Sequence, residues 1–323
     1  IMGPDVCFGA MTDASPCADA TYFRALLVSA GPSTIDDITV HAYGLTGPKG
    51  GRPANETNCF VADFLNRTEY RQRVVPVVAQ WQRIAREIAP GANLVLSETA
   101  TAADGGCPGL SNSFVAGFYF VDILGELAAM GVHQVYRQDL VGFSGIGGGS
   151  SYALLGDPGW YNKEVGGRLA PNPDYFTALL YRTLVASQRL PVKVTTTSVS
   201  SSVPGGSGGA EEGELVAYAA CAVGGGIVIS FLNPGSSSIV MAVSVTGGGG
   251  GSGGKGPGPL DIYMLTAPGG NLTSRGIELN GKIMTPDAPL VPQKGDSSRR
   301  VKVPAHSYGF VVDRAAKGKH CGY

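Results

Sequence analysis

The most constraining feature of the sequence is a short apolar segment that delivers one carboxylate into a glycine-rich turn. Residues 92–96 lead directly to Glu98, and Gly105 and Gly106 follow. A short, mostly apolar run of this kind indicates a strand buried in a parallel sheet. A glutamate at the C-terminal end of such a strand lies where (β/α) barrels expose reactive side chains, although it can equally pair with a cation of a loop. Glu98 is therefore a candidate catalytic residue.

Strand and helix patterns alternate through the first part of the chain. Strands are predicted at residues 1–7, 37–43, 92–96 and 132–138. Helices are predicted at residues 19–29, 114–130 and 173–186, together with one that Thr68 caps and whose apolar residues recur every three or four positions as far as Ile88. We expect Ser111 to cap the helix at 114–130 and Gly131 to end it. Four strand and helix units make half of an eight-stranded barrel.

After Leu190 the pattern changes to short alternating strands separated by turn residues. These strands are predicted at residues 192–194, 214–218, 226–232, 239–243, 260–265 and 308–312. Such a series is typical of a β-sandwich, and the glycine-rich runs 204–209 and 247–258 are expected to be loops without chemistry. The predicted fold class is therefore α/β plus all-β. The C-terminal half of a (β/α)8 TIM barrel at 1–188, carrying the catalytic residues, precedes a β-sandwich at 189–323.

Composition restricts the function. The net charge of −1 and the pI near 6.5 provide no basic footprint for nucleic acid. The long apolar segment 114–130 contains Asp122 and Glu126, so we expect a helix buried against a sheet and no transmembrane segment. The chain opens without the basic and apolar regions of a secretory signal, and we expect an N-terminal part to be missing.

Cysteines and glycosylation sequons point to the secretory pathway. The six cysteines are scattered without a CxxC pair or a histidine at ligand spacing, so a metal site is not expected, and neither is a cofactor. Three Asn-X-Thr sequons, at Asn55, Asn66 and Asn271, lie in polar or glycine-flanked segments. We therefore expect a secreted glycoprotein that is extracellular, lysosomal or vacuolar, or peripherally associated with a membrane.

The order of several motifs along the chain resembles the heparanase-like β-glucuronidases of glycoside hydrolase family 79. The central motifs are Ser97-Glu98-Thr99, the Gly105-Gly106 turn, Leu110-Ser111-Asn112-Ser113-Phe114, Ala116-Gly117-Phe118, Met130-Gly131-Val132 and Tyr136-Arg137-Gln138. The flanking motifs are Gly3-Pro4-Asp5-Val6, Val40-His41-Ala42-Tyr43, Pro173-Asp174-Tyr175-Phe176 and Pro304-Ala305-His306-Ser307-Tyr308-Gly309-Phe310. The resemblance is collinear and covers nearly the whole chain, apart from several glycine-rich insertions.

The resemblance implies roles for individual residues. Glu98 matches the nucleophile of a retaining glycosidase, and His41 and Tyr43 match residues beside it. The residues that match contacts to the uronic acid are Gly105, Gly106, Gln138 and Tyr152. The resemblance also implies a disulfide between Cys221 and Cys321, whereas Cys7, Cys17, Cys59 and Cys107 remain unassigned. For His41 alone, a core histidine is the structural alternative, and Arg137 should point away from Gln138 and be structural.

Retaining glycosidases need a second carboxyl group as acid/base, and the family carries it in a strand-four Asn-Glu-Pro motif. That motif is absent from this sequence, so the acid/base is expected in a missing N-terminal part of the barrel. The first hypothesis is a β-glucuronidase acting on a uronic-acid-containing carbohydrate. Because a basic face is not evident, we favour exo-acting or other specificity over endo-acting cleavage of sulfated chains. The second hypothesis is a catalytically silent carbohydrate-binding or scaffold protein.

Overall fold

The computed structural model describes residues 1–7, 20–48, 57–142, 150–156, 169–195, 215–245, 258–316 and 321. The chain divides into two compact units, Ile1–Tyr175 and Phe176–Tyr323. The boundary predicted after residue 188 falls within strand β9 (Val185–Leu190). Cys17, Asn55, the run 204–209 and most of the run 247–258 lie outside the described residues.

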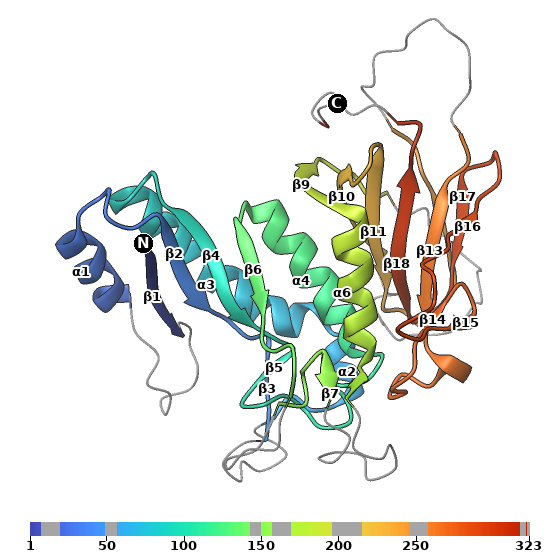
Figure 1. Ribbon diagram of the computed structural model, residues 1–323, viewed down its shortest axis with the longest axis horizontal. Helices are drawn as coiled ribbons and strands as arrows, with labels where there is room; N and C mark the ends of the chain where they lie inside the picture. The colour runs from blue at the N-terminus through green and yellow to red at the C-terminus, as the bar shows by residue number, and fades with distance from the viewer. Residues whose placement is uncertain are drawn as a thin grey trace, which may run out of the picture. The chain divides into compact units, whose positions relative to one another are not determined.

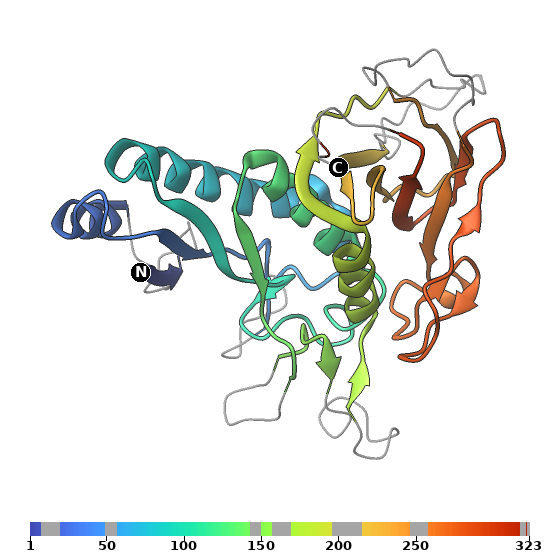
Figure 2. The same cartoon turned by 45° about the horizontal axis from the view of Figure 1, so that its top comes forward.

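The first unit is built around a four-stranded parallel sheet with the order β1-β2-β4-β6 (Figure 1). Its strands are β1 (Met2–Cys7), β2 (Asp37–His41), β4 (Asn93–Thr99) and β6 (Gln134–Arg137). Helices α1 (Ala20–Ala30), α3 (Arg67–Ile88) and α4 (Ala116–Met130) follow β1, β2 and β4 in turn and line one side of the sheet (Figure 2). The predicted alternation of strand and helix is confirmed, as parallel pairing with helical crossovers requires.

Aromatic pairs hold the helices of this unit together. Phe23 of α1 meets Trp81 of α3 edge to face, with ring centroids 4.5 Å apart. Tyr70 of α3 meets Tyr119 of α4 in the same manner at 5.1 Å. All four side chains are almost completely buried, so they supply much of the apolar area that stabilises the helical layer. Among the described residues, no helix combines the length and apolar character needed to cross a membrane.

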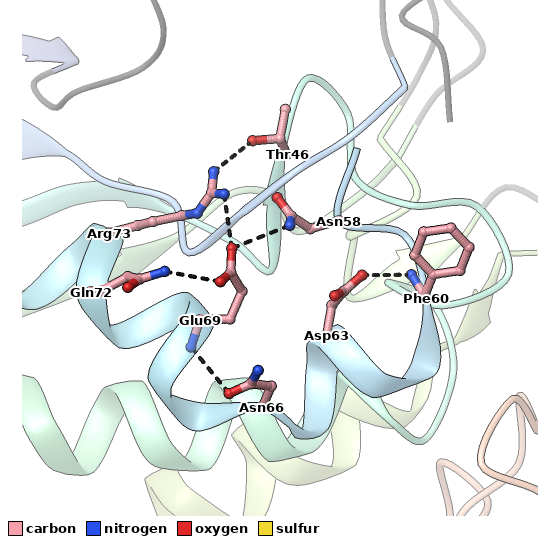
Figure 3. Close-up of polar contacts among 8 residues, drawn as sticks. All are labelled: Thr46, Asn58, Phe60, Asp63, Asn66, Glu69, Gln72 and Arg73. Carbon is pink, nitrogen blue, oxygen red and sulfur yellow. Dashed lines mark hydrogen bonds and ion pairs between the residues drawn. The ribbon is translucent and has the colours of Figure 1, made fainter. Parts of the chain in front are cut away.

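Polar side chains fix the entry into α3 (Figure 3). The N-cap is Asn66, whose Oδ1 accepts a hydrogen bond from the backbone N–H of Glu69 at 3.2 Å, so the prediction of Thr68 as the cap is wrong. Both residue types cap helices well, and the tertiary contacts decide between them. The Glu69 carboxylate accepts hydrogen bonds from three side chains, Asn58, Gln72 and Arg73. Glycosylation of the exposed Asn66 stays a prediction.

The ends of α4 differ in how well the sequence predicted them. Gly131 ends the helix in the left-handed conformation with φ 81°, as predicted. The prediction that Ser111 caps its start is wrong, because α4 begins at Ala116 after Val115, which makes no side-chain cap. Ser111 instead accepts hydrogen bonds from the Cys107 backbone N–H at 2.8 Å and the Thr101 hydroxyl at 2.7 Å. This hydroxyl therefore stabilises the turn before the helix.

Short elements complete the first unit. Strand β3 (Leu45–Thr46) pairs in parallel with β5 (Ala102–Ala103), and β7 (Leu155–Gly156) pairs antiparallel with β8 (Ala170–Pro171). Helix α2 (Val61–Leu65) precedes α3. A disulfide between Cys59 and Cys107 joins the segment before α2 to the turn before α4, with the Cα atoms 5.4 Å apart. The sequence alone left these two cysteines unassigned.

The second unit contains an eight-stranded sheet in which the neighbouring pairs are antiparallel, and a separate two-stranded sheet. The large sheet follows the order β15-β14-β13-β18-β11-β10-β9, with β16 paired to β13. Its longer strands are β9 (Val185–Leu190), β10 (Val216–Ala222), β11 (Ile227–Asn233), β13 (Asp261–Thr266) and β18 (Ser307–Asp313). Its short strands are β14 (Glu278–Leu279), β15 (Lys282–Ile283) and β16 (Gln293–Lys294).

The small sheet of this unit pairs β12 (Ile239–Ala242) with β17 (Arg300–Val303). Met241 of β12 and Val303 of β17 belong to one apolar cluster with Phe231 and Val311 of the large sheet, so the two sheets share a core. The predicted strand at 192–194 is wrong, because the chain forms β9 directly after α6 (Pro173–Leu184). Cys221 and Cys321 form a disulfide with the Cα atoms 5.4 Å apart.

Candidate active site at the strand ends

A bulge at the end of β1 aims an aspartate that the sequence analysis did not select. In the parallel pairing with β2, Pro4 and Val6 oppose consecutive residues, so Asp5 between them is an extra residue. Its φ of 57° is in the left-handed region, which aspartate tolerates better than most residues. Bulges redirect side chains and recur next to active sites. Here the bulge directs the Asp5 carboxylate to β2.

A second bulge lies at the same end of β4. Val40 pairs with Leu96, but the next residue of β2, His41, pairs with Glu98, so Ser97 is the extra residue. The Ser97 hydroxyl lies 3.2 Å from the Val40 carbonyl oxygen. This irregularity places Glu98 directly beside His41 at the C-terminal end of the sheet. Two adjacent bulges therefore shape the end of the sheet where the predicted nucleophile lies.

Two residues that were predicted from the sequence to lie in the site are next to the Glu98 carboxylate. The Tyr43 hydroxyl donates a hydrogen bond to Glu98 Oε1 at 2.5 Å, and His41 Nδ1 lies 3.7 Å from the same oxygen. The His41 side chain is 18% exposed and that of Glu98 is 30% exposed. The structure thus brings Glu98, His41 and Tyr43 together around a carboxylate that solvent and ligands can reach.

Asp5 contacts the other side of the His41 ring. Its Oδ1 lies 3.1 Å from His41 Nε2. A hydrogen bond from the Ser97 hydroxyl lowers the pKa of Asp5 below its usual value, partial burial opposes this shift, and His41 adds to it. Asp5 is therefore ionised over the whole range above its ordinary pKa. In the sequence Asp5 stands out only as part of a motif, because its contact with His41 depends on the bulge.

Tyr152 lies next to Tyr43, with ring centroids 6.2 Å apart. Three hydrogen bonds hold its segment in place. Ser151 donates from its backbone N–H and its hydroxyl to the Gly105 carbonyl oxygen at 2.7 and 2.9 Å, and Arg137 Nη2 donates to the Tyr152 carbonyl oxygen at 2.9 Å. The ring of Tyr152 therefore lies by the nucleophile candidate, and its predicted contact with uronic acid stays a prediction.

Both tyrosines of the site are held as neutral phenols. Burial raises the pKa of Tyr152 to about 12, and the negative charges of Glu98 and Asp139 contribute. Burial likewise raises the pKa of Tyr43, and both Tyr152 and the Glu98 carboxylate add to this shift. A neutral Tyr43 can donate a hydrogen bond to Glu98, and this hydrogen bond holds the carboxylate in place.

The raised pKa values predict the alkaline behaviour of the fold. Because the fold favours the neutral phenol, each such tyrosine contributes its full stabilisation below the pKa of about 10 that tyrosine has in the unfolded chain. This stabilisation is lost as the pH rises through the pKa of the tyrosine in the folded protein, which is about 12 for Tyr152. We expect ultraviolet titration of the native protein to show a late tyrosinate step that loses amplitude in Tyr152→Phe. Protein unfolded in urea serves as the control and should titrate in one step. A native titration curve identical to the unfolded one would contradict the prediction.

The backbone conformation and packing of the turn explain its two glycines without any ligand. Gly105 and Gly106 have φ values of 87° and 83°. A Cβ at Gly106 would lie 2.5 Å from Ser151 Oγ, so this buried position admits only glycine. Gln138 is partly exposed, and its backbone N–H donates to the Thr99 carbonyl oxygen at 2.9 Å. Contact of these three residues with a uronic acid stays a prediction.

Arg137 points away from the site and supports it. Its Nη2 lies 2.7 Å from Asp174 Oδ2, and both side chains are almost fully buried. Its guanidinium also lies over the Phe120 ring, 4.7 Å from the centroid. This agrees with the structural role that we expected from its alternation with Gln138. The ion pair ties β6 to the first turn of α6.

Asp139 is a further carboxyl group near the site to which the sequence analysis assigned no role. The Ser150 hydroxyl lies 2.8 and 2.7 Å from its two oxygens. Burial raises the pKa of Asp139, and the negative charge of Glu98 adds to this shift. Within the described part of the chain, no three histidine, cysteine, aspartate or glutamate side chains are arranged to hold a metal ion. The site therefore presents carboxyl, imidazole and phenol groups.

Comparison with solved structures identifies the fold. The GH51 arabinofuranosidase from Xanthomonas axonopodis pv. citri matches with a TM-score of 0.60 and 17% identity, over 91% of this chain and 56% of that enzyme. A 4-O-α-L-rhamnosyl-β-D-glucuronidase from Fusarium oxysporum 12S matches with a TM-score of 0.56 and 17% identity, over 87% of this chain and 54% of that enzyme. The chain thus has a fold found in glycoside hydrolases.

Comparison of sequences is more specific, although no family model matches the chain. Mus musculus heparanase is 28% identical over 334 residues, which cover 99% of this chain and 52% of that protein. Baicalin-β-D-glucuronidase of Scutellaria baicalensis is 29% identical over 231 residues, which cover 69% of this chain and 36% of that enzyme. The chain spans about half the length of the heparanases it matches. These relatives support placing the chain in the heparanase-like family of glycosidases, glycoside hydrolase family 79.

Proposed function

We propose that the protein is a retaining β-glucuronidase that removes β-linked glucuronic acid from a polysaccharide, proteoglycan or glycoconjugate, with Glu98 as nucleophile. The observation that carries the proposal is the Glu98 carboxylate at a strand end, with the Tyr43 hydroxyl at 2.5 Å and His41 Nδ1 at 3.7 Å from Oε1. Its relatives named heparanase and baicalin-β-D-glucuronidase support the substrate class. A site of this kind combines an ionisable nucleophile with neighbours that orient it.

The geometry suggests how Glu98 attacks. Tyr43 and His41 both contact Oε1, so Oε2 is the oxygen that attacks the anomeric carbon and forms the glycosyl–enzyme bond. The leaving group takes a proton from the acid/base, and water activated by the same group then releases the sugar with its configuration retained. Tyr43 keeps the nucleophile in one orientation during both steps. Tyr152 and Gln138 at the same end of the sheet contact the uronic acid in this proposal.

The proposed architecture is the C-terminal half of a (β/α)8 barrel followed by a β-sandwich. Four parallel strands with helical crossovers support the first part, and two sheets that share one core support the second. The acid/base, as well as the barrel strands that complete the site, then come from sequence outside this chain. We place the protein in the secretory pathway, where both disulfides and the exposed sequons at Asn66 and Asn271 are compatible with its environment.

The alternative is a catalytically silent sugar-binding protein. Inactive heparanase-2 of Homo sapiens is 31% identical over 134 residues, which cover 42% of this chain and 20% of that protein. A silent protein can retain His41, Tyr43 and Glu98 for sugar contact alone. Hydrolysis decides between the two functions.

The test is hydrolysis by protein expressed from its full coding sequence. We expect release of glucuronic acid from an aryl β-glucuronide, with the β-anomer appearing first by NMR and then mutarotating. The matched aryl β-glucoside, which carries a hydroxymethyl group in place of the carboxylate, should react far more slowly because carboxylate contacts are lost. Sugar binding without hydrolysis supports the silent alternative. Initial release of the α-anomer contradicts the retaining mechanism.

A further inference from the structure

We propose that Asp5 is a positioning residue that keeps a proton on each nitrogen of His41 and thereby makes His41 the cationic partner of the Glu98 carboxylate. His41 lies between two carboxylates, with Nε2 3.1 Å from Asp5 Oδ1 and Nδ1 3.7 Å from Glu98 Oε1. The arrangement Asp5, His41, Glu98 runs across three adjacent strands, β1, β2 and β4, at the same end of the sheet.

The number of protons on the His41 ring determines which contacts its two nitrogens can make. A neutral imidazole has one N–H donor and one nitrogen that can only accept. An ionised carboxylate only accepts, so a neutral His41 would set a lone pair against one of its two neighbours. The Tyr43 hydroxyl already uses its proton on Glu98 Oε1. A ring with protons on both nitrogens is the form that satisfies both contacts.

The bulge at Asp5 makes this arrangement specific. In a regular β1 strand, Asp5 would pair in register with β2. Its side chain would then follow the ordinary alternation of side chains between the two faces of the sheet. The extra residue and the φ of 57° instead bring the carboxylate to His41 Nε2. The Ser97 hydroxyl, itself in the β4 bulge, also hydrogen-bonds to Asp5 and stabilises its ionised form. Both irregularities therefore serve one contact chain that ends at Glu98.

The charged and titratable groups around the ring determine how it responds to pH. Asp5 faces it from β1 and Glu98 from β4, and Tyr43 follows the end of β2, the strand that carries the ring. Tyr152 and Asp139 interact electrostatically with Glu98. The anion of Asp5 is therefore the specific partner of Nε2, and neutralising it should release a proton from the ring.

The first readout does not depend on turnover. We expect the ring nitrogens of His41, assigned with a His41→Gln variant, to give two N–H type ¹⁵N signals at neutral pH in the wild-type protein. In Asp5→Asn, which keeps the size of the side chain, one nitrogen should change to the lone-pair type. Asp36→Asn is the control, because Asp36 precedes β2 at the end of that strand opposite to His41. Identical His41 signals in wild type and Asp5→Asn would overturn the proposal.

The second readout, a role in catalysis, rests on the proposed function. We expect Asp5→Asn to lower kcat roughly tenfold, as loss of one charge-assisted hydrogen bond predicts. The alkaline limb of its pH–rate profile should also shift to lower pH, and Asp5→Glu should restore part of the rate. If the wild type hydrolyses nothing but the ¹⁵N signals change as expected, the proposed function fails and the role of Asp5 stands. An unchanged alkaline limb in a folded, active Asp5→Asn overturns the catalytic role.

Discussion

Replacing Glu98 with glutamine is expected to abolish covalent capture of a mechanism-based β-glucuronide inactivator and to lower the hydrolysis rate by at least roughly 10³-fold. The amide cannot attack the anomeric carbon, yet it keeps the shape of the side chain and an oxygen that can accept the Tyr43 hydrogen bond. Intact-mass analysis measures the adduct, and peptide mapping should locate it on Glu98. The protein for this experiment is expressed from its full coding sequence.

Two variants make this experiment discriminating. Glu126→Gln makes the same chemical change on α4, where Glu126 pairs with Arg71, and should react like the wild type. Glu98→Ala with added azide tests the role of the carboxylate directly. Azide can enter the space left by a missing nucleophile and should give the α-glucuronosyl azide. A β-configured azide would assign Glu98 to the acid/base role, and an adduct that persists in Glu98→Gln would assign the nucleophile to another residue.

The sequence predicted the parts of the site that depend on single strands. Each strand of the first sheet was predicted close to its observed position, because apolar runs between helices have few other ways to be buried. Glu98, His41 and Tyr43 followed from their places at strand ends and from the family resemblance. The structure brings these three side chains together, with Glu98 Oε1 as the common contact.

The features that the sequence did not predict depend on two segments at once. The bulges at Asp5 and Ser97 are set by register against the neighbouring strand, which local patterns do not encode. The Cys59 to Cys107 pairing depends on how two loops meet, and their sequence separation of 48 carries no such information. Strands β14, β15 and β16 were missed because runs of two residues show no measurable alternation, and β17 was missed although its Arg-Val-Lys-Val sequence alternates.

Asp122 is a single side chain whose contacts likewise could not be predicted from the sequence. In the sequence it interrupts an apolar segment and argues against a membrane span. In the structure it is completely buried, and its oxygens accept hydrogen bonds from Arg67 Nε and Nη2 at 2.9 Å and from the Tyr70 hydroxyl at 2.9 Å. The partners come from α3, so the register between two helices determines whether this charge is satisfied.

Replacing Asp122 with alanine is expected to destabilise the protein by about 3–5 kcal/mol, because it removes a fully buried carboxylate that accepts hydrogen bonds from Arg67 and Tyr70. Thermal unfolding followed by circular dichroism measures the loss as a lower Tm. Glu87→Ala is the control, since it breaks the exposed ion pair with Arg24 on the same helical layer, and its Tm should stay at the wild-type value.

A triple substitution separates the cost of an unpaired charge from the loss of a favourable contact. Asp122→Leu with Arg67→Met and Tyr70→Phe removes every polar group of the cluster while filling its volume. Replacing a buried ion pair by apolar residues of similar size is often neutral or stabilising, so we expect this variant to recover most of the lost Tm. If the triple variant is instead as unstable as Asp122→Ala, the cluster stabilises the packing of α3 on α4 through its ionic geometry. The destabilisation by Asp122→Ala would then measure a favourable interaction rather than an unpaired charge.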